Sequence, residues 1–216
     1  MDTGSKSTDV VARLNEAVRS LNAGKFKDAR KICDRILVAD PDNVKALNIL
    51  GGSLARSGKM TQAIQVAERV CFLSPGNAVF YSNLSNLHGA VGHVPKAMLV
   101  MAHAVTSDTN NIVYQTKFAH MIDHLTFNKV TAETVVIKEA IKICMGNPDI
   151  DVGSFSLAWH SLLMLDPLFI KFATITQNGN FKEQADEVNI KELAEPLTDP
   201  FFFAWTKIFA RNRCKV

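Results

Sequence analysis

Long apolar runs and cysteine motifs are what this sequence lacks most clearly. No run of about 18 uncharged apolar residues occurs, so we expect no membrane-spanning helix. The polar residues 1–9 lack the apolar core of a signal peptide, and a cytoplasmic protein is the expectation. The four cysteines form no C-x-x-C pair, which favours reduced thiols over a disulfide framework or a zinc site.

Concentrated positive charge is also absent. The formal net charge of +3 is spread along the chain, and no block of Lys and Arg is long enough to follow a phosphate backbone. Nucleic acid is therefore not the expected partner. Proline and glycine are few, at 7 and 11 residues, and 47% of the chain is hydrophobic, which is enough to bury a core.

An internal repeat of 34 residues is the strongest signal that the sequence does contain. Three residue types recur strictly at this offset: Gly24, Gly58 and Gly92; Ala29, Ala63 and Ala97; Asn43, Asn77 and Asn111. Apolar residues between these columns recur at helical spacing. The pattern predicts pairs of amphipathic helices that must stack on one another, because a single pair cannot bury its apolar face.

Each column has a physical reason. A glycine where the chain reverses tolerates a positive φ, which other residues rarely adopt. An alanine in the second helix of each pair allows the two helices to approach closely. Pro41 and Pro75 end the second helices, and the asparagines that follow them are suited to cap the next helix.

The residues of the second repeat resemble the tetratricopeptide repeat, through Leu50, Gly51, Gly58, Met60, Ala63, Val70 and Pro75. Leu84, Gly92, Ala97 and Ala104 continue most of that pattern in the third repeat. The resemblance implies an all-α fold, a right-handed solenoid of helix pairs with a divergent helical cap at its C-terminal end.

The repeat divides the chain into segments. We expect a disordered N-terminus at residues 1–9 and three repeats at 10–43, 44–77 and 78–111. Residues 112–145 are expected to form a degenerate fourth helix pair, because Thr126 and Thr131 replace the glycine and the alanine. Residues 146–216 are expected to form a C-terminal helical extension, with helices that begin at Asp166 and Asp199, each followed by proline.

The C-terminal aromatic segment around Phe201 and Trp205 allows three interpretations. It closes the end of the solenoid, docks another domain, or lies on a membrane surface. It is also a candidate surface for self-association.

The second half of the chain also resembles the linker after the repeats in bacterial proteins whose repeat array precedes an S-adenosylmethionine-dependent methyltransferase domain. The likeness involves Phe118 to Leu125, Asn147-Pro148-Asp149-Ile150-Asp151, Leu165-Asp166-Pro167 and Leu197-Thr198-Asp199-Pro200. No glycine-rich loop of a catalytic domain is present in the sequence.

Catalytic and metal-binding patterns are incomplete. His120 and His124 lie four residues apart on an expected helix, but the glutamate of the zincin motif and a third ligand are missing. Ser154 and Ser161 near His160 lack the G-x-S-x-G frame of a hydrolase. We therefore predict no enzyme activity, no metal and no cofactor.

The tetratricopeptide resemblance implies a groove lined by the first helix of each pair. Carried over residue by residue, it gives these candidate binding residues: Lys45, Asn48, Arg56, Ser82, Asn86, Thr116, His120 and His124. Asparagine amides can bond to both the N–H and the C=O of a peptide backbone. Lys45 and Arg56 would favour an acidic segment or a carboxylate.

The sequence therefore predicts a protein-interaction module that binds a peptide or helix of a partner in this groove. The alternative is an accessory or substrate-presenting fragment related to the N-terminal half of a methyltransferase that carries the same repeats.

Overall fold

The structure is a computed structural model that describes residues 3–123 and 125–165. The chain divides into two compact units, Met1–Asp108 and Thr109–Val216, and each is described by itself. The helices expected to begin at Asp166 and Asp199, the aromatic segment and its self-association lie outside the described residues.

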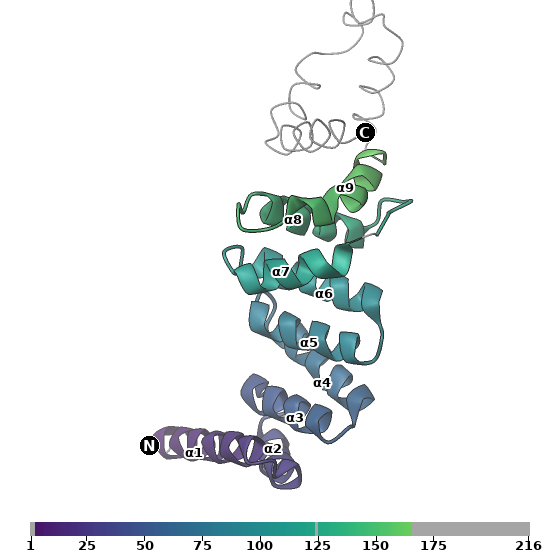
Figure 1. Cartoon of the computed structure of the whole chain (residues 1–216). Helices are drawn as coiled ribbons and strands as arrows, with labels where there is room; N and C mark the ends of the chain where they lie inside the picture. Colours follow the sequence, from purple (N-terminus) through teal and green to yellow (C-terminus); the bar gives the residue numbers. More distant parts are fainter. Residues whose placement is uncertain (1–2, 124, 166–216) are drawn as a thin grey trace, which may run out of the picture. The chain divides into compact units, whose positions relative to one another are not determined.

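The first unit is a series of helices joined by short turns (Figure 1). They are α1 (Thr3–Asn22), α2 (Phe26–Ala39), α3 (Val44–Arg56), α4 (Met60–Leu73), α5 (Ala78–Ala90) and α6 (Val94–Ser107). Each helix packs against the next along the chain, and α3 also packs against α1.

The N-terminal prediction requires a correction. Residues 1–9 were expected to be disordered, whereas α1 begins at Thr3. Extending an existing helix adds one hydrogen bond per residue, so polar residues can continue it without a packed face. An ion pair between Asp9 and Arg13, 2.7 Å long and one helical turn apart, supports this end of α1.

The turns inside the helix pairs confirm the role predicted for the repeated glycines. Gly24, Gly58 and Gly92 have φ values of 74°, 78° and 77°. These lie in the left-handed region, where an added Cβ is strained even though it would meet no atom within 4 Å at any of the three. Backbone conformation, rather than space, therefore selects glycine at these turns.

The repeated asparagines cap the first helix of each following pair, as the sequence predicted. The Oδ1 of Asn43 accepts the N–H of Ala46 at 3.0 Å, and the Oδ1 of Asn77 accepts the N–H of Val79 at 3.1 Å. Each cap satisfies an N–H that the helix itself cannot pair.

Small residues meet where the two helices of a pair cross. Ala63 and Ala97, in the second helices of their pairs, are 0% and 1% exposed. A Cβ added at Gly51 on α3 would lie 3.9 Å from the carbonyl oxygen of Ala63. One repeat later Ser85 stands in the place of Gly51, and its hydroxyl donates to the carbonyl of Ala97 at 2.7 Å. The crossing thus has room for a very small side chain only.

A buried hydroxyl also joins neighbouring pairs. Ser53 on α3 is fully buried and donates to the carbonyl of Phe26, at the start of α2, at 2.8 Å. Around this region the first two pairs share one core, which consists of Leu14, Ala17, Cys33, Ile36, Ala46 and Ile49. Stability therefore depends on packing between pairs as well as within them.

The second unit contains α7 (Ile112–Ile122), α8 (Ala132–Met145), the 3-10 helix η1 (Val152–Phe155) and α9 (Ser156–Leu163). Thr131 caps α8 through a reciprocal pair of hydrogen bonds with Thr134. Phe118 of α7 and Phe155 of η1 are both fully buried, and their rings stack with centroids 6.2 Å apart. These two aromatic side chains join α7 to η1 in the core of the described part of the unit.

The described residues form helices and turns and contain no strand, which confirms the all-α helix-pair solenoid. Within the same residues, no helix is both long and apolar enough to cross a membrane.

A histidine occupies one core position of the third pair. His88 is 3% exposed, and the corresponding residues of the preceding and following repeats are Leu54 and Ile122, both buried. The Nδ1 of His88 is buried without a hydrogen-bond partner, and its Nε2 lies 3.9 Å from the carboxylate of Glu68. Burial lowers the pKa of His88 below its ordinary value of 6.5, because the charged imidazolium would lose its water.

We expect Ala63→Leu and Ala97→Leu each to lower the free energy of unfolding by about 1–3 kcal/mol through overpacking at the crossing. Urea unfolding followed by circular dichroism measures the change. Ala12→Leu is the matched control, because Ala12 is exposed on α1. Equal stability of the Ala63 and Ala12 variants would contradict the close crossing.

We expect His88→Leu to reduce the loss of stability in acid. Because burial lowers the pKa of His88, the folded protein protonates it at a lower pH than the unfolded chain, which takes up this proton near pH 6.5. The stability that neutral His88 contributes is therefore complete above pH 6.5 and is lost as the pH falls from there towards the lowered folded pKa. Urea unfolding measured above and below pH 6.5 should show that the free energy of unfolding falls more steeply with decreasing pH in the wild type than in His88→Leu. His103, a half-buried histidine whose pKa is also lowered, remains in both proteins, so equal losses of stability in the two proteins would refute the role of His88.

Candidate functional site

The candidate site is a cavity of about 390 Å³ in the first unit. Residues of α1, α3, α4 and α5 surround it: Val18, Leu21, Leu47, Asn48, Ile49, Gly51, Gly52, Ala67, Asn83, Asn86 and Leu87. Most of the lining is aliphatic, and its polar side chains are three asparagines. A largely apolar surface with a few placed polar groups is typical of a binding site.

The three asparagines come from two helices. Asn48 lies half-buried on α3, and Asn83 and Asn86 lie exposed on α5. In the described part of the chain, none of these three side-chain amides makes a hydrogen bond to another residue. Each amide can donate two hydrogen bonds and accept through its oxygen. Their full bonding capacity is therefore open to solvent or to a bound molecule.

Two of the predicted groove residues meet in this cavity, and two others lie beside it. Asn48 and Asn86 are part of the lining. Lys45 and Arg56 are exposed at opposite ends of α3 but do not line the cavity. The Nη1 of Arg56 donates to the carbonyl of Leu21 at 3.3 Å, so its guanidinium stands at the end of α1.

Ser82 was predicted as a groove residue, and the structure corrects this. Ser82 is 6% exposed and belongs to the buried stripe of α5 together with Ala78 and Ser85. It stands in the same repeat position as Asn48, but its side chain is too short to reach the surface from there. The prediction transferred a position and neglected side-chain length.

Of the polar side chains that line the cavity, Asn83 is the one that the sequence analysis did not predict. It precedes Asn86 by three residues and Leu87 by four, a spacing that places all three on one face of a helix. That spacing was the available signal. It was overlooked because the corresponding residue of the second repeat is the buried, apolar Ile49.

The groove residues predicted for the fourth pair stay predictions. Thr116 and His120 lie exposed on α7 of the second unit. His124 lies outside the described residues. Among the residues that the structure does describe, no group of three or more His, Cys, Asp or Glu side chains is placed to hold a metal ion.

The three cysteines among the described residues are poor nucleophiles in this fold. Cys33, Cys71 and Cys144 are buried. Burial raises the pKa of Cys33 and Cys71 to about 11 and that of Cys144 to about 12. The reactive thiolate form is therefore scarce near neutral pH.

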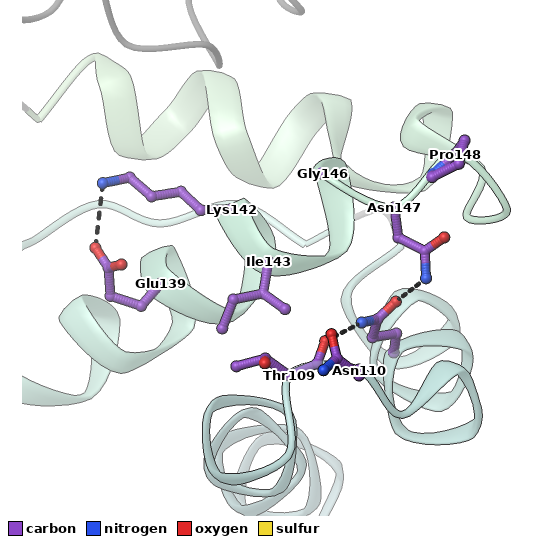
Figure 2. A pocket seen from close by; sticks show the side chains of 9 residues that line it. Thr109, Asn110, Glu139, Lys142, Ile143, Gly146, Asn147 and Pro148 are labelled. Atoms are coloured by element: carbon purple, nitrogen blue, oxygen red, sulfur yellow. Dashed lines mark hydrogen bonds and ion pairs between the residues drawn. The ribbon is translucent and has the colours of Figure 1, made fainter.

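A second pocket, of about 550 Å³, lies in the second unit and is shown in Figure 2. Four of its polar side chains are already bonded in pairs, Gln115 with Asn147 and Lys142 with Glu139. Gln115 is 1% exposed; its Nε2 donates to the carbonyl of Thr109 at 2.6 Å, and its Oε1 accepts Asn147 Nδ2 at 2.6 Å. Lys142 and Glu139 form an ion pair of 3.2 Å, drawn as a dashed line in Figure 2. This pocket is built around a structural hydrogen-bond chain, so the first cavity is the better candidate site.

No family model matches the chain. Among solved structures, the chain is similar to the MamA protein, with 18% identity, a TM-score of 0.50, and coverage of 83% of this chain and 96% of that one. It is also similar to a mutant O-GlcNAc transferase from Thermobaculum terrenum, with 22% identity, a TM-score of 0.50, and coverage of 63% of this chain. The fold is that of a tetratricopeptide repeat array.

The likeness to the transferase covers 26% of that protein's chain, so the chain spans about a quarter of its length. The predicted resemblance to repeat-containing methyltransferases depends mainly on motifs at Asp166 and Asp199. Both motifs lie outside the described residues, and that resemblance stays a prediction.

We expect Gln115→Leu to lower the free energy of unfolding of the second unit by about 1–3 kcal/mol, because it removes both side-chain hydrogen bonds of the buried Gln115 and leaves the half-buried Asn147 amide without this partner. Fluorescence of the buried Trp159 during urea unfolding, in a Trp205→Phe background, reports the change. Thr116→Ala, at the exposed next residue, should change stability by less than about 0.5 kcal/mol. If the two variants unfold together, the hydrogen-bond chain does not stabilise the fold.

Proposed function

We propose that the first unit is a protein-binding module that holds an extended segment of a partner protein in the cavity between α1, α3 and α5. The observation that supports this most strongly is the set of three unbonded amides on an apolar surface. An extended backbone offers alternating N–H and C=O groups, and an asparagine amide can bond to either.

The aliphatic side chains of the cavity would supply most of the affinity. Val18 is 40% exposed, and Leu21 and Leu87 are half-buried, so a ligand can remove apolar surface from water at all three. Burial of apolar surface contributes about 25 cal/mol per Å². The amides would then fix the direction and register of the segment.

The helices around the cavity contain charges of both signs. Lys45 and Arg56 lie on α3, whereas α1 contains Glu16 and α4 contains Glu68, next to Ala67 of the lining. The proposal therefore includes no charge preference for the segment. The proposal includes no chemical step and no cofactor.

Selection from a random twelve-residue peptide library displayed on phage, with the full chain as bait, tests the proposal. We expect enriched peptides that bind the wild type and bind the Asn83→Ala, Asn86→Ala double variant about tenfold or more weakly, since each lost hydrogen bond costs about 1 kcal/mol. Asn15→Ala, an exposed asparagine of α1 outside the cavity, is the control and should bind normally.

Circular dichroism should show that both variants fold as the wild type does, because the replaced side chains are exposed. Failure to enrich any peptide, or equal binding by the double variant and the control, would contradict the proposed function.

A further inference from the structure

Gly52 lies in the interior of α3, where glycine is less favourable than alanine. The fold does not explain its presence. Gly52 has ordinary helical geometry, and an added Cβ would meet only the Cδ2 of Leu21, at the ordinary contact distance of 3.5 Å. It therefore differs from the turn glycines, which have a positive φ.

The corresponding positions of the other repeats carry side chains. Asn86 follows Gly52 by one repeat, and His120 follows by two. The second repeat thus lacks the side chain that would otherwise project from this face of its first helix. Gly52 and Asn86 both line the cavity, so the missing side chain leaves part of the cavity open.

The open part is bounded by aliphatic side chains. Leu21 lies closest to Gly52, and Val18 and Leu47 belong to the same lining. Val18 remains 40% exposed although it is apolar. A hollow with these neighbours can desolvate a hydrocarbon side chain and offers no carboxylate to a charged one.

We propose that the hollow over Gly52 is a subsite for one aliphatic side chain of the bound segment, and that Gly52 determines which side chains fit. This inference rests on the proposed function. The occupant is a segment of a partner protein that carries leucine, isoleucine or methionine at one position. The aliphatic side chains of Val18, Leu21 and Leu47 in the same lining set this preference.

The test uses synthetic peptides made from the enriched phage sequences and the full-length protein. We expect these peptides to share one aliphatic position, and its replacement by alanine to weaken binding to the wild type by about tenfold or more. Gly52→Leu fills the hollow and should weaken binding of the aliphatic peptide to a similar extent. Fluorescence anisotropy of the labelled peptides measures both effects.

Gly89→Leu is the matched control. Gly89 is also a helical glycine, an added Cβ there would meet nothing within 4 Å, and it does not line the cavity. This variant should keep the affinity of the wild type. If Gly52→Leu fails to fold, Gly52→Ala is used instead. This variant should raise thermal stability, because alanine is more favourable than glycine inside a helix. It should weaken binding of the peptide with the aliphatic residue more than binding of the peptide in which alanine replaces that residue.

The outcomes separate the two proposals. One outcome refutes the subsite and leaves the binding module standing. In it, the Asn83→Ala, Asn86→Ala double variant binds the peptide more weakly than the wild type, but the Gly52→Leu and Gly89→Leu variants bind it equally well. Enriched peptides without a shared aliphatic position also refute the subsite alone. If no peptide is enriched, both proposals fail. The subsite is supported if Gly52→Leu, but not Gly89→Leu, loses affinity, and loses it only for peptides that carry the aliphatic residue.

Discussion

The close crossing of the two helices in each pair, at an alanine with almost no exposed surface, is the constraint on which the rest of this structure depends. Ala63 and Ala97 meet Gly51 and Ser85 there, and a larger residue would separate the helices. Because the crossing fixes which face of α3 packs against α4, it also fixes which face remains outside. Asn48 and Gly52, four residues apart on α3, line the cavity, next to Gly51 of the crossing.

Repeat positions of this chain fall into two kinds. Those at turns and caps, and the alanine of the second helix at each crossing, keep one residue type, because backbone conformation or space permits little else. Those that line the cavity change from repeat to repeat, as Gly52 becomes Asn86. His88 is an exception in the core, because the corresponding residues one repeat before and one repeat after it are the apolar Leu54 and Ile122. Variation at a position that the fold leaves unconstrained is where a binding preference can be encoded, and the proposed subsite is an example.

The sequence predicted the fold well because its decisive features are local. A glycine with positive φ or an asparagine cap depends on a few neighbouring residues, so the columns of Gly24 and Asn43 could be interpreted without a structure. The site was harder to predict, because it forms where separate helices converge. Ser82 and Asn83 differ by one residue, yet one is buried and the other lines the cavity. The periodicity of a sequence locates one face of a helix only to within about one residue. At the edge of that face, side-chain length decides whether a residue reaches the surface.

The central claim is that a bound segment contacts the amides of α3 and α5. Nuclear magnetic resonance of the side-chain amides during titration with a phage-selected peptide tests it most directly. The account predicts shifts for the amide groups of Asn48, Asn83 and Asn86, and unchanged signals for exposed amides of the second helices, such as Gln62 and Gln65 on α4. Shifts at Gln62 and Gln65 with unchanged signals from the three asparagines would contradict it.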